Sequence, residues 1–141
     1  MTRRSFESVT VGQALTEYRK VVTREDIAAY AEASLDRNPL HLDDEAARAR
    51  GFDGIIGHGM FTMAHVATCL TEWAGDPGAI THIKAAFRAA VVPGDEMVAG
   101  GSVTALDPKT RRAKLEIWVT VDRGGSEEQA VRRSTAEVQL A

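Results

Sequence analysis

Two short segments of the sequence combine residue types that can transfer protons and stabilise negative charge. The first runs from Asp36 to His41 and places a carboxylate, an amide and an imidazole within six residues. The second covers residues 57–60 and reads Gly-His-Gly-Met, the composition of a tight turn that opens a helix. A carboxylate and a histidine that converge on one water molecule can exchange protons with a substrate. Because the free N–H groups at a helix start can stabilise an oxyanion, we expect the two segments to form one active site.

The spacing of Asp36 and His41 admits a catalytic and a structural interpretation. Pro39 lies between them and restricts the loop, so both side chains can be held together at a low cost in conformational entropy. Histidine exchanges protons near neutral pH, which suits general acid–base catalysis. Alternatively, Asp36 caps a turn and His41 is a structural residue, and spacing alone slightly favours this alternative. Asn38 either shapes the Asn-Pro turn or fixes the loop and positions a water.

Residues 57–60 also have two interpretations. If a helix starts here, the Gly59 N–H is free to receive charge, and the missing side chain lets a substrate approach the backbone closely. The alternative is that the glycines only make the turn. His58 either contacts substrate or caps the helix and packs, and packing is the more common role. Further along, we expect His65 to be a hydrogen-bonded core or interface residue, while His82 has no identifiable partner.

The sequence lacks the signatures of several large enzyme classes. It has no Gly-x-Ser-x-Gly elbow, no phosphate-binding loop and no dinucleotide glycine fingerprint, which disfavours serine-triad hydrolases, nucleotide enzymes and nicotinamide enzymes. The four histidines include no His-x-x-x-His pair, and the single cysteine leaves no Cys pair, so we expect neither a metal site nor a cofactor. Cys69 excludes an intrachain disulfide and lies among apolar residues, as a buried structural thiol does.

The size and charge of the chain narrow its possible partners. With 141 residues it is expected to form a single domain, residues 1–141, with a substantial core. Its formal net charge of -3 gives no reason to expect nucleic acid or an anionic membrane as a partner. No apolar run approaches the roughly 20 residues of a membrane span, and residues 1–6 lack the apolar region of a secretory signal. A cytoplasmic location is therefore expected.

Caps and periodicity predict three helical segments. Thr23 and Asp26 resemble a capping box, which predicts a helix from there to about Ser34. Residues 35–42 are expected as a loop, and a short helix is predicted over 43–50, with acids at its start and arginines near its end. The longest helix is predicted from His58 to Trp73, ending at Gly75. Since its polar residues form only a narrow stripe, we expect it to be buried on nearly all sides.

Extended structure dominates the second half of the chain. Short extended pieces are predicted at residues 6–11 and 18–22. Alternation of apolar and polar side chains, or a weaker form of it, predicts strands at residues 97–106, 115–121 and 130–140. No helix intervenes between these strands, so the sheet should be antiparallel. The expected fold is α+β, with about five strands wrapped round one long central helix and the helical segment 23–50 over one edge. The open side and edge strand of such a sheet favour a dimer.

The segment from Tyr30 to His41 resembles the hydratase motif of the MaoC-like family, the (R)-specific enoyl-thioester hydratases and dehydratases. Residues 57–60 resemble the start of that family's central helix, and residues 73–78 and the spacing from Phe87 to Gly94-Asp95 are also similar. The resemblance extends over essentially the whole chain and is closest in kind to the β-hydroxyacyl-carrier-protein dehydratase subunits of actinobacterial type II fatty-acid synthesis. It implies the hot-dog fold, a sheet wrapped round a long helix, usually as a dimer.

Two positions depart from the pattern of the family. Leu35 stands where many members have glycine, which is expected to alter the loop without removing the acid. Ala89-Ala90 replace a common proline and are expected to affect only strand detail. The three polar residues of the motif are intact, which argues against a non-catalytic subunit: Asp36, Asn38 and His41.

The resemblance implies reversible hydration of a trans-2-enoyl thioester to the (R)-3-hydroxyacyl thioester, without a cofactor or metal. Asp36 and His41 would hold one water and share the proton transfers, and the Gly59 N–H would receive charge from the thioester oxygen. Asn38 and His58 would position these groups, and the acyl chain would run past Met60 and Met63. The expected partners are an acyl thioester of CoA or acyl carrier protein, and a second copy or a related subunit. The alternatives are an acyl-CoA thioesterase on the same fold and a non-catalytic acyl-binding subunit of a heterodimer.

Overall fold

The computed structural model describes residues 2–141, which form three α-helices, three short 3-10 helices and five strands. The α-helices are α1 (Arg24–Ser34), α2 (Asp44–Ala49) and α3 (Gly59–Ala74). The 3-10 helices cover Phe6–Ser8, Pro39–His41 and Pro77–Ala79. The strands are β1 (Tyr18–Val21), β2 (Ile80–Lys84), β3 (Glu96–Asp107), β4 (Arg112–Asp122) and β5 (Glu127–Gln139).

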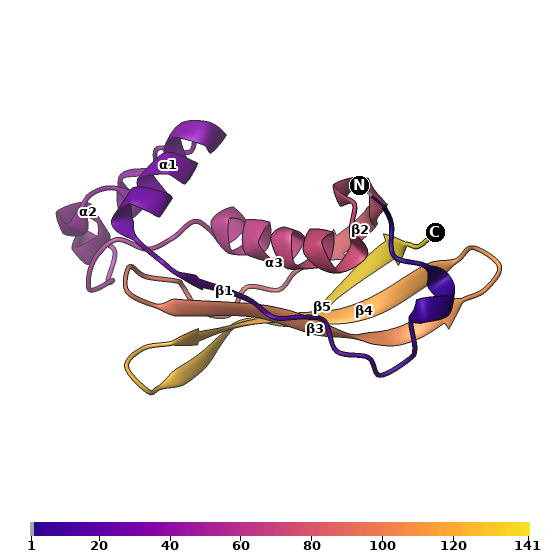
Figure 1. Ribbon diagram of the computed structural model, residues 1–141. Helices are drawn as coiled ribbons and strands as arrows, with labels where there is room; N and C mark the ends of the chain where they lie inside the picture. The colour runs from indigo at the N-terminus through magenta and orange to yellow at the C-terminus, as the bar shows by residue number, and fades with distance from the viewer. Residues whose placement is uncertain (1) are drawn as a thin grey trace.

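The strands form one antiparallel sheet in the order β1-β3-β4-β5-β2, and α3 lies along its concave face (Figure 1). In β4 every second side chain is buried beneath the helix, and the alternate side chains face outward, as period 2 requires. The buried set is Ala113, Leu115, Ile117, Val119 and Val121. The expected α+β class and hot-dog architecture are therefore confirmed, and the sheet has five strands, with β2 as the fifth instead of residues 6–11.

Helix α3 is buried on one side only, so the prediction that it is buried on nearly all sides is wrong for this chain. Phe61, Val66 and Leu70 are buried against the sheet, as are several other side chains of that face. On the opposite face, Met60 is 56% exposed and Ala64 is also exposed. The physical reason is geometric, because a single curled sheet covers only one face of the helix that it surrounds.

The N-terminal third of the chain differs from expectation in two places. Residues 6–8 form a 3-10 turn instead of a strand, because the Arg4 and Phe6 N–H groups donate to the Ala74 and Ala141 carbonyls rather than to a neighbouring strand. Helices α1 and α2 lie beyond the N-terminal end of α3, at the end of the molecule opposite the chain termini (Figure 1). They therefore cover one end of the sheet instead of one of its edges.

Two smaller expectations can be compared with the structure. Cys69 is buried, and burial raises the pKa of its thiol to about 11, so the thiol stays protonated at neutral pH as a structural residue does. Among residues 2–141, no helix has the length and apolar character needed to cross a membrane.

Helix α1 begins with a capping box and ends with a left-handed residue, and the latter fixes the direction of the following loop. The Thr23 hydroxyl accepts the Asp26 N–H while the Asp26 carboxylate accepts the Thr23 N–H, a complete capping box. At the other end Leu35 adopts φ 63° and ψ 12°, a left-handed conformation that strains a side chain with a Cβ. This is the position where the family resemblance leads one to expect glycine.

We expect Leu35→Gly to raise the free energy of unfolding by about 1 kcal/mol, because glycine relieves the strain of the left-handed conformation. Little packing is lost, since the Leu35 side chain is 72% exposed. Urea unfolding followed by circular dichroism measures the change. The matched control is Leu35→Ala, which removes the side chain but keeps the Cβ. Equal stability of the Gly and Ala variants would contradict the assignment of strain to this residue.

Candidate active site

The loop after α1 is folded by its own polar side chains. The Asn38 Oδ1 accepts the Leu40 N–H at 3.1 Å and caps the 3-10 helix Pro39–His41. The Asn38 N–H donates to Asp36 Oδ1 at 3.3 Å. The Asn38 side chain thus shapes the backbone that carries the other two polar residues of the motif, in agreement with a role in geometry.

His41 is held in one orientation by the segment that precedes α3. Its side chain is buried, and its Nδ1 lies 2.7 Å from the carbonyl oxygen of Ile56. Because a carbonyl can only accept, neutral His41 must carry its proton on Nδ1. The Nε2 atom is then left with a free lone pair that can accept a proton or a hydrogen bond.

His58 supports this arrangement from the opposite side. Its Nε2–H donates to the backbone carbonyl of Asp36 at 2.9 Å, and its ring stacks on His41 with 3.7 Å between centroids. Tyr30 packs on His58 with 4.9 Å between ring centroids. His58 therefore packs and holds the loop, as the commoner interpretation predicts in part, but its side chain makes no capping bond to the helix. Its buried Nδ1 has no hydrogen-bond partner within residues 2–141.

The first segment and the helix start come together as expected. One ligand atom from each of Asp36, His41 and His58 lies within 4.8 Å of the other two. Asp36 is exposed whereas both histidines are buried, so the carboxylate forms the open side of the cluster. At this separation one water molecule can reach both the Asp36 carboxylate and the His41 ring.

The carboxylate and the two imidazoles of this cluster are also side chains that commonly bind metal ions. However, the two imidazole rings are stacked with their planes only 23° apart, so their in-plane lone pairs lie in separate, nearly parallel planes. A tetrahedral zinc site needs ligands that converge. The geometry therefore suits a shared water better than an ion, and the absence of a metal stays a prediction.

The start of α3 offers free donors, as the pattern of glycines indicates. The His58 side chain makes no capping bond, and the Gly59 and Met60 N–H groups donate to no residue of the described chain. Gly59 lies in a cleft of about 310 Å³ that the structure forms from residues far apart in sequence. Its lining includes Phe52, Ile56, Gly57, Thr62, Phe87 and Val91.

Phe87 and Thr62 were not among the predicted site residues, whereas Met60 and Met63 were. A Cβ added to Gly59 would lie 3.5 Å from the Phe87 ring, so this aromatic side chain covers the helix start. Met60 and Met63 do not line the cleft, and Met60 lies on the exposed face of α3. The acyl path past the two methionines stays a prediction, and the cleft offers a second path.

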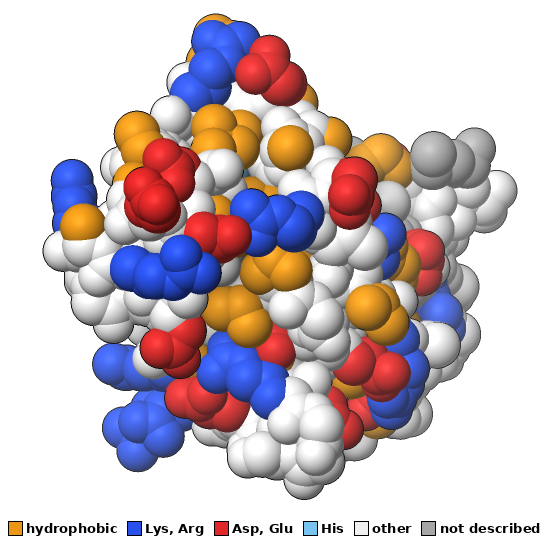
Figure 2. All heavy atoms as spheres, turned by 90° about the vertical axis from the view of Figure 1, so that its left-hand side faces the viewer, with side chains coloured by type: hydrophobic (Ala, Val, Ile, Leu, Met, Phe, Trp, Pro, Cys, Tyr) orange, Lys and Arg blue, Asp and Glu red, His pale blue; other side chains and the backbone are white. Residues whose placement is uncertain are grey.

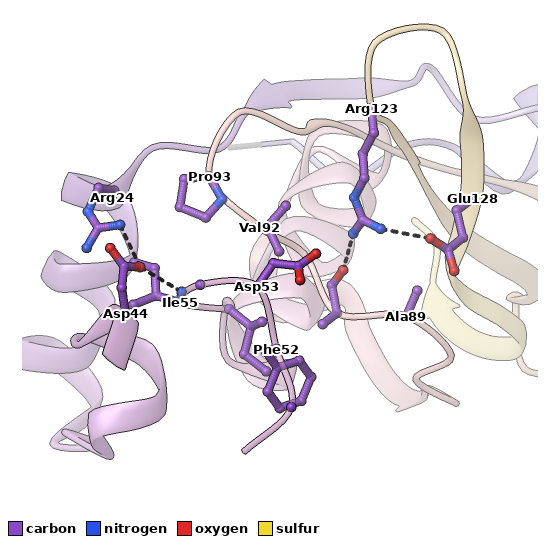
Figure 3. Close-up of a pocket in the computed structure, with 14 residues that line it drawn as sticks. Arg24, Asp44, Phe52, Asp53, Ile55, Ala89, Val92, Pro93, Arg123 and Glu128 are labelled. Atoms are coloured by element: carbon purple, nitrogen blue, oxygen red, sulfur yellow. Dashed lines mark hydrogen bonds and ion pairs between the residues drawn. The ribbon is translucent and has the colours of Figure 1, made fainter. Parts of the chain in front are cut away.

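A larger cleft of about 570 Å³ adjoins the first and shares Phe52 and Ile56 with it. Figure 3 shows Arg24 and Asp44 on one side of this cleft and Arg123 and Glu128 on the other. Arg24 pairs with Asp44 at 3.1 Å, and Asp44 also accepts the Ile55 N–H at 3.0 Å. The bond to Ile55, followed by the one to Arg24, lowers the pKa of the Asp44 carboxyl.

The remaining histidines lie outside this cluster. The His65 Nδ1–H donates to the Phe61 carbonyl at 2.8 Å, and burial lowers the pKa of the His65 ring. It is thus the hydrogen-bonded residue that was expected. His82 is exposed on β2. At the end of the molecule that carries α1 and α2, charges of both signs surround scattered apolar groups (Figure 2).

The family described as MaoC like domain matches residues 6–131 of the sequence. The chain belongs to this MaoC-like family. Among curated relatives, the mitochondrial 3-hydroxyacyl-[acyl-carrier-protein] dehydratase of Arabidopsis thaliana is 42% identical over 102 residues, which cover 67% of this chain and 60% of the relative. The 3-hydroxybutyryl-CoA dehydratase of Methylorubrum extorquens is 36% identical over 118 residues, 82% of this chain and 74% of the relative.

Solved structures of (R)-hydratases have the same fold as this MaoC-like chain. An (R)-hydratase from A. caviae, described as involved in PHA biosynthesis, superposes with a TM-score of 0.84 at 32% identity. The superposition covers 96% of this chain and 99% of the other. The hot-dog fold expected from the sequence resemblance is therefore that of solved (R)-hydratases.

The two histidine hydrogen bonds predict opposite tautomers in this MaoC-like site. Neutral His41 should carry its proton on Nδ1 and neutral His58 on Nε2, because each bonds a carbonyl oxygen through that atom. Two-dimensional ¹H–¹⁵N spectra of the imidazole rings distinguish the forms, with exposed His82 as the internal reference. If His41 were found with its proton on Nε2, its Nδ1 could not donate to the Ile56 carbonyl, and the described hydrogen bond would be wrong.

Proposed function

We propose that this protein catalyses reversible hydration of a trans-2-enoyl thioester to the (R)-3-hydroxyacyl thioester. The observation that carries the proposal is the approach of the Asp36 carboxylate to His41, whose Nδ1 proton is held by the Ile56 carbonyl. The dehydratase and (R)-hydratase names of the relatives support this reaction class and the (R) product. The chain spans 60% of the Arabidopsis relative, so that protein's activity enters here only as support.

In the forward direction, Asp36 and His41 hold one water by accepting its two protons in hydrogen bonds. As the water oxygen forms a bond to C3, one of the pair removes a proton from the water. That pair then delivers a proton to C2, so the product gains one water and the protein returns to its starting protonation state. The free His41 Nε2 lone pair suits it to accept a proton from the water.

Negative charge develops on the thioester oxygen between these two steps. The unpaired Gly59 N–H, at the positive end of the sixteen-residue helix α3, is the donor placed to stabilise it. The cleft of Gly59 and Phe87 would take the acyl chain, and the larger adjoining cleft would take the carrier arm of the thioester. CoA and acyl carrier protein both present such an arm.

Assembly forms part of the proposal. The exposed face of α3 around Met60 and Ala64, together with the open edge at β2, presents apolar and backbone groups that a second chain would cover. A homodimer or a heterodimer with a related subunit satisfies this requirement. Sedimentation of the purified chain measures the homodimer directly.

We expect Asp36→Asn and His41→Ala each to lower the rate of enoyl-thioester hydration by roughly 10²–10⁴-fold, the usual contribution of a general acid or base. Loss of absorbance of the conjugated enoyl thioester measures the reaction. His82→Ala, which removes an exposed histidine, is the control and should keep wild-type turnover. Near-normal turnover in both folded site variants would rule out the proposed chemistry.

The same assay separates the alternative functions when free thiol is measured alongside absorbance. Hydration consumes the enoyl absorbance without releasing thiol, whereas a thioesterase releases thiol. Binding of an acyl thioester without either signal would identify a non-catalytic subunit. The proposal requires loss of absorbance at constant thiol.

Gly59→Ala tests the oxyanion donor with little risk to the fold. The added methyl would meet the Phe87 ring at 3.5 Å, an ordinary contact, but it would narrow the approach to the N–H group. We expect an unchanged melting temperature and a turnover lower by up to about 10²-fold. Wild-type turnover in this variant would show that the thioester oxygen does not bind at the start of α3.

A further inference from the structure

A buried carboxylate outside the cluster of Asp36, His41 and His58 takes no part in the chemistry described so far. Asp95 stands at the turn before β3, and its side chain is only 2% exposed. Its Oδ1 accepts Arg123 Nε at 2.9 Å, and its Oδ2 accepts Arg123 Nη2 at 3.1 Å. The Val92 N–H also donates to Oδ2, at 2.9 Å. A buried charge is tolerated only with such pairing, so Asp95 fixes Arg123 in a single orientation.

Arg123 uses its remaining donors to hold a second segment. From the hairpin between β4 and β5, its Nη2 also donates to the carbonyl of Ala90, and its Nη1 donates to Glu128 at 2.8 Å. Figure 3 shows the guanidinium reaching across the cleft wall toward Glu128 and toward the segment that carries Ala89 and Val92. Asp95 and Arg123 therefore form a clamp that binds residues 90–92 at both ends, through the Ala90 carbonyl and the Val92 N–H.

The clamped segment in turn holds the start of α3. Between its two anchors lies Val91, whose carbonyl accepts the Gly57 N–H at 2.6 Å. Val91 is 1% exposed, and a Cβ on Gly57 would lie 3.4 Å from the Val91 oxygen, so the two backbones are in close contact. Gly57 precedes Gly59 by two residues. A shift of residues 90–92 would therefore be passed directly to the backbone that aims the Gly59 N–H.

We infer that Arg123, oriented by Asp95, is a positioning residue for the proposed oxyanion donor. It touches neither the cluster of Asp36 and His41 nor the Gly59 N–H. It acts by fixing residues 90–92, because the Val91 carbonyl in this segment accepts the Gly57 N–H. The inference rests on the proposed function for its kinetic consequence, but its structural consequence does not depend on activity.

Arg123→Met removes the clamp, and Arg111→Met is a matched control. Arg111 also makes a two-point pair with one carboxylate, that of Glu7, and also donates to a backbone carbonyl, that of Ala141. It lies in the turn between β3 and β4, at the other end of the sheet. We expect Arg123→Met to lower kcat between about ten- and a hundredfold with KM within twofold, since small misplacements of catalytic groups carry penalties of this size. Arg111→Met should leave both constants unchanged.

Further variants guard against misfolding and against a direct role in binding. The double variant Asp95→Asn with Arg123→Met leaves no unpaired buried charge, and it should fold and show the same loss of kcat. Arg123→Lys keeps the charge but cannot reach Asp95 and Ala90 together, so its kcat should lie between those of wild type and Arg123→Met.

Amide ¹H–¹⁵N spectra give a readout that does not require turnover. The Gly57 and Gly59 signals should move in the Arg123→Met and double variants and stay in place in Arg111→Met. Unmoved signals with wild-type kcat in a folded variant would overturn the inference. So would a rise in KM at constant kcat, because the guanidinium would then bind substrate. If wild-type protein hydrates no enoyl thioester while the signals still move, the proposed function fails and the clamp remains.

Discussion

The hydrogen bond from His41 Nδ1 to the Ile56 carbonyl, at 2.7 Å, joins the two parts of the molecule on which the site depends. It connects the loop that follows α1 to the short segment that leads into α3. The same bond fixes the His41 tautomer and leaves the lone pair on its Nε2 free, while the Asp36 carboxylate lies close to the same histidine. A second hydrogen bond, from His58 Nε2–H to the Asp36 carbonyl, joins the residue before α3 to the same loop. Without these bonds the loop and the helix start would be independent, and an acid, a base and an oxyanion donor would have no common position.

Residues 55–58 are held from several directions, which explains how a loop can position catalytic groups. The Ile55 N–H donates to Asp44 of α2, and the Gly57 N–H donates to Val91 next to the sheet. His58 is buried between Tyr30 and His41. Each contact comes from a different element, so the entropy of ordering the segment is lost on folding and not when substrate binds. Helices α1 and α2 at the end of the sheet are thus part of the active-site framework.

Local signals in the sequence were sufficient for most of the helices and strands and for naming the central pair. The capping box of Thr23 and Asp26, the alternation along β4 and the glycine that ends α3 all act over a few residues, and each was predicted. Asp36 and His41 were identified because a proline-restricted loop brings neighbours together. Their spacing alone favoured a structural role, and the family resemblance was needed to prefer catalysis.

The features that sequence reasoning missed depend on distant contacts. Arg123 pairs with Asp95 across 28 residues, and Phe87 contacts the start of α3 at Gly59 from a separate segment. No local sequence pattern can predict contacts of this kind. The exposed face of α3 was missed for another reason: apolar periodicity shows that a face needs covering, but not whether the same chain covers it. The left-handed Leu35 broke a rule of local conformational preference, and such exceptions cluster near functional loops.

The central claim is that Asp36 and His41 act on one shared water. A double-mutant cycle with Asp36→Asn and His41→Ala measures this most directly, using kcat/KM for enoyl-thioester hydration. Two residues that serve one proton-transfer step are strongly non-additive, so the double variant should be about as slow as the slower single variant. If the two losses multiplied instead, the residues would act independently and the account of a shared water would be wrong.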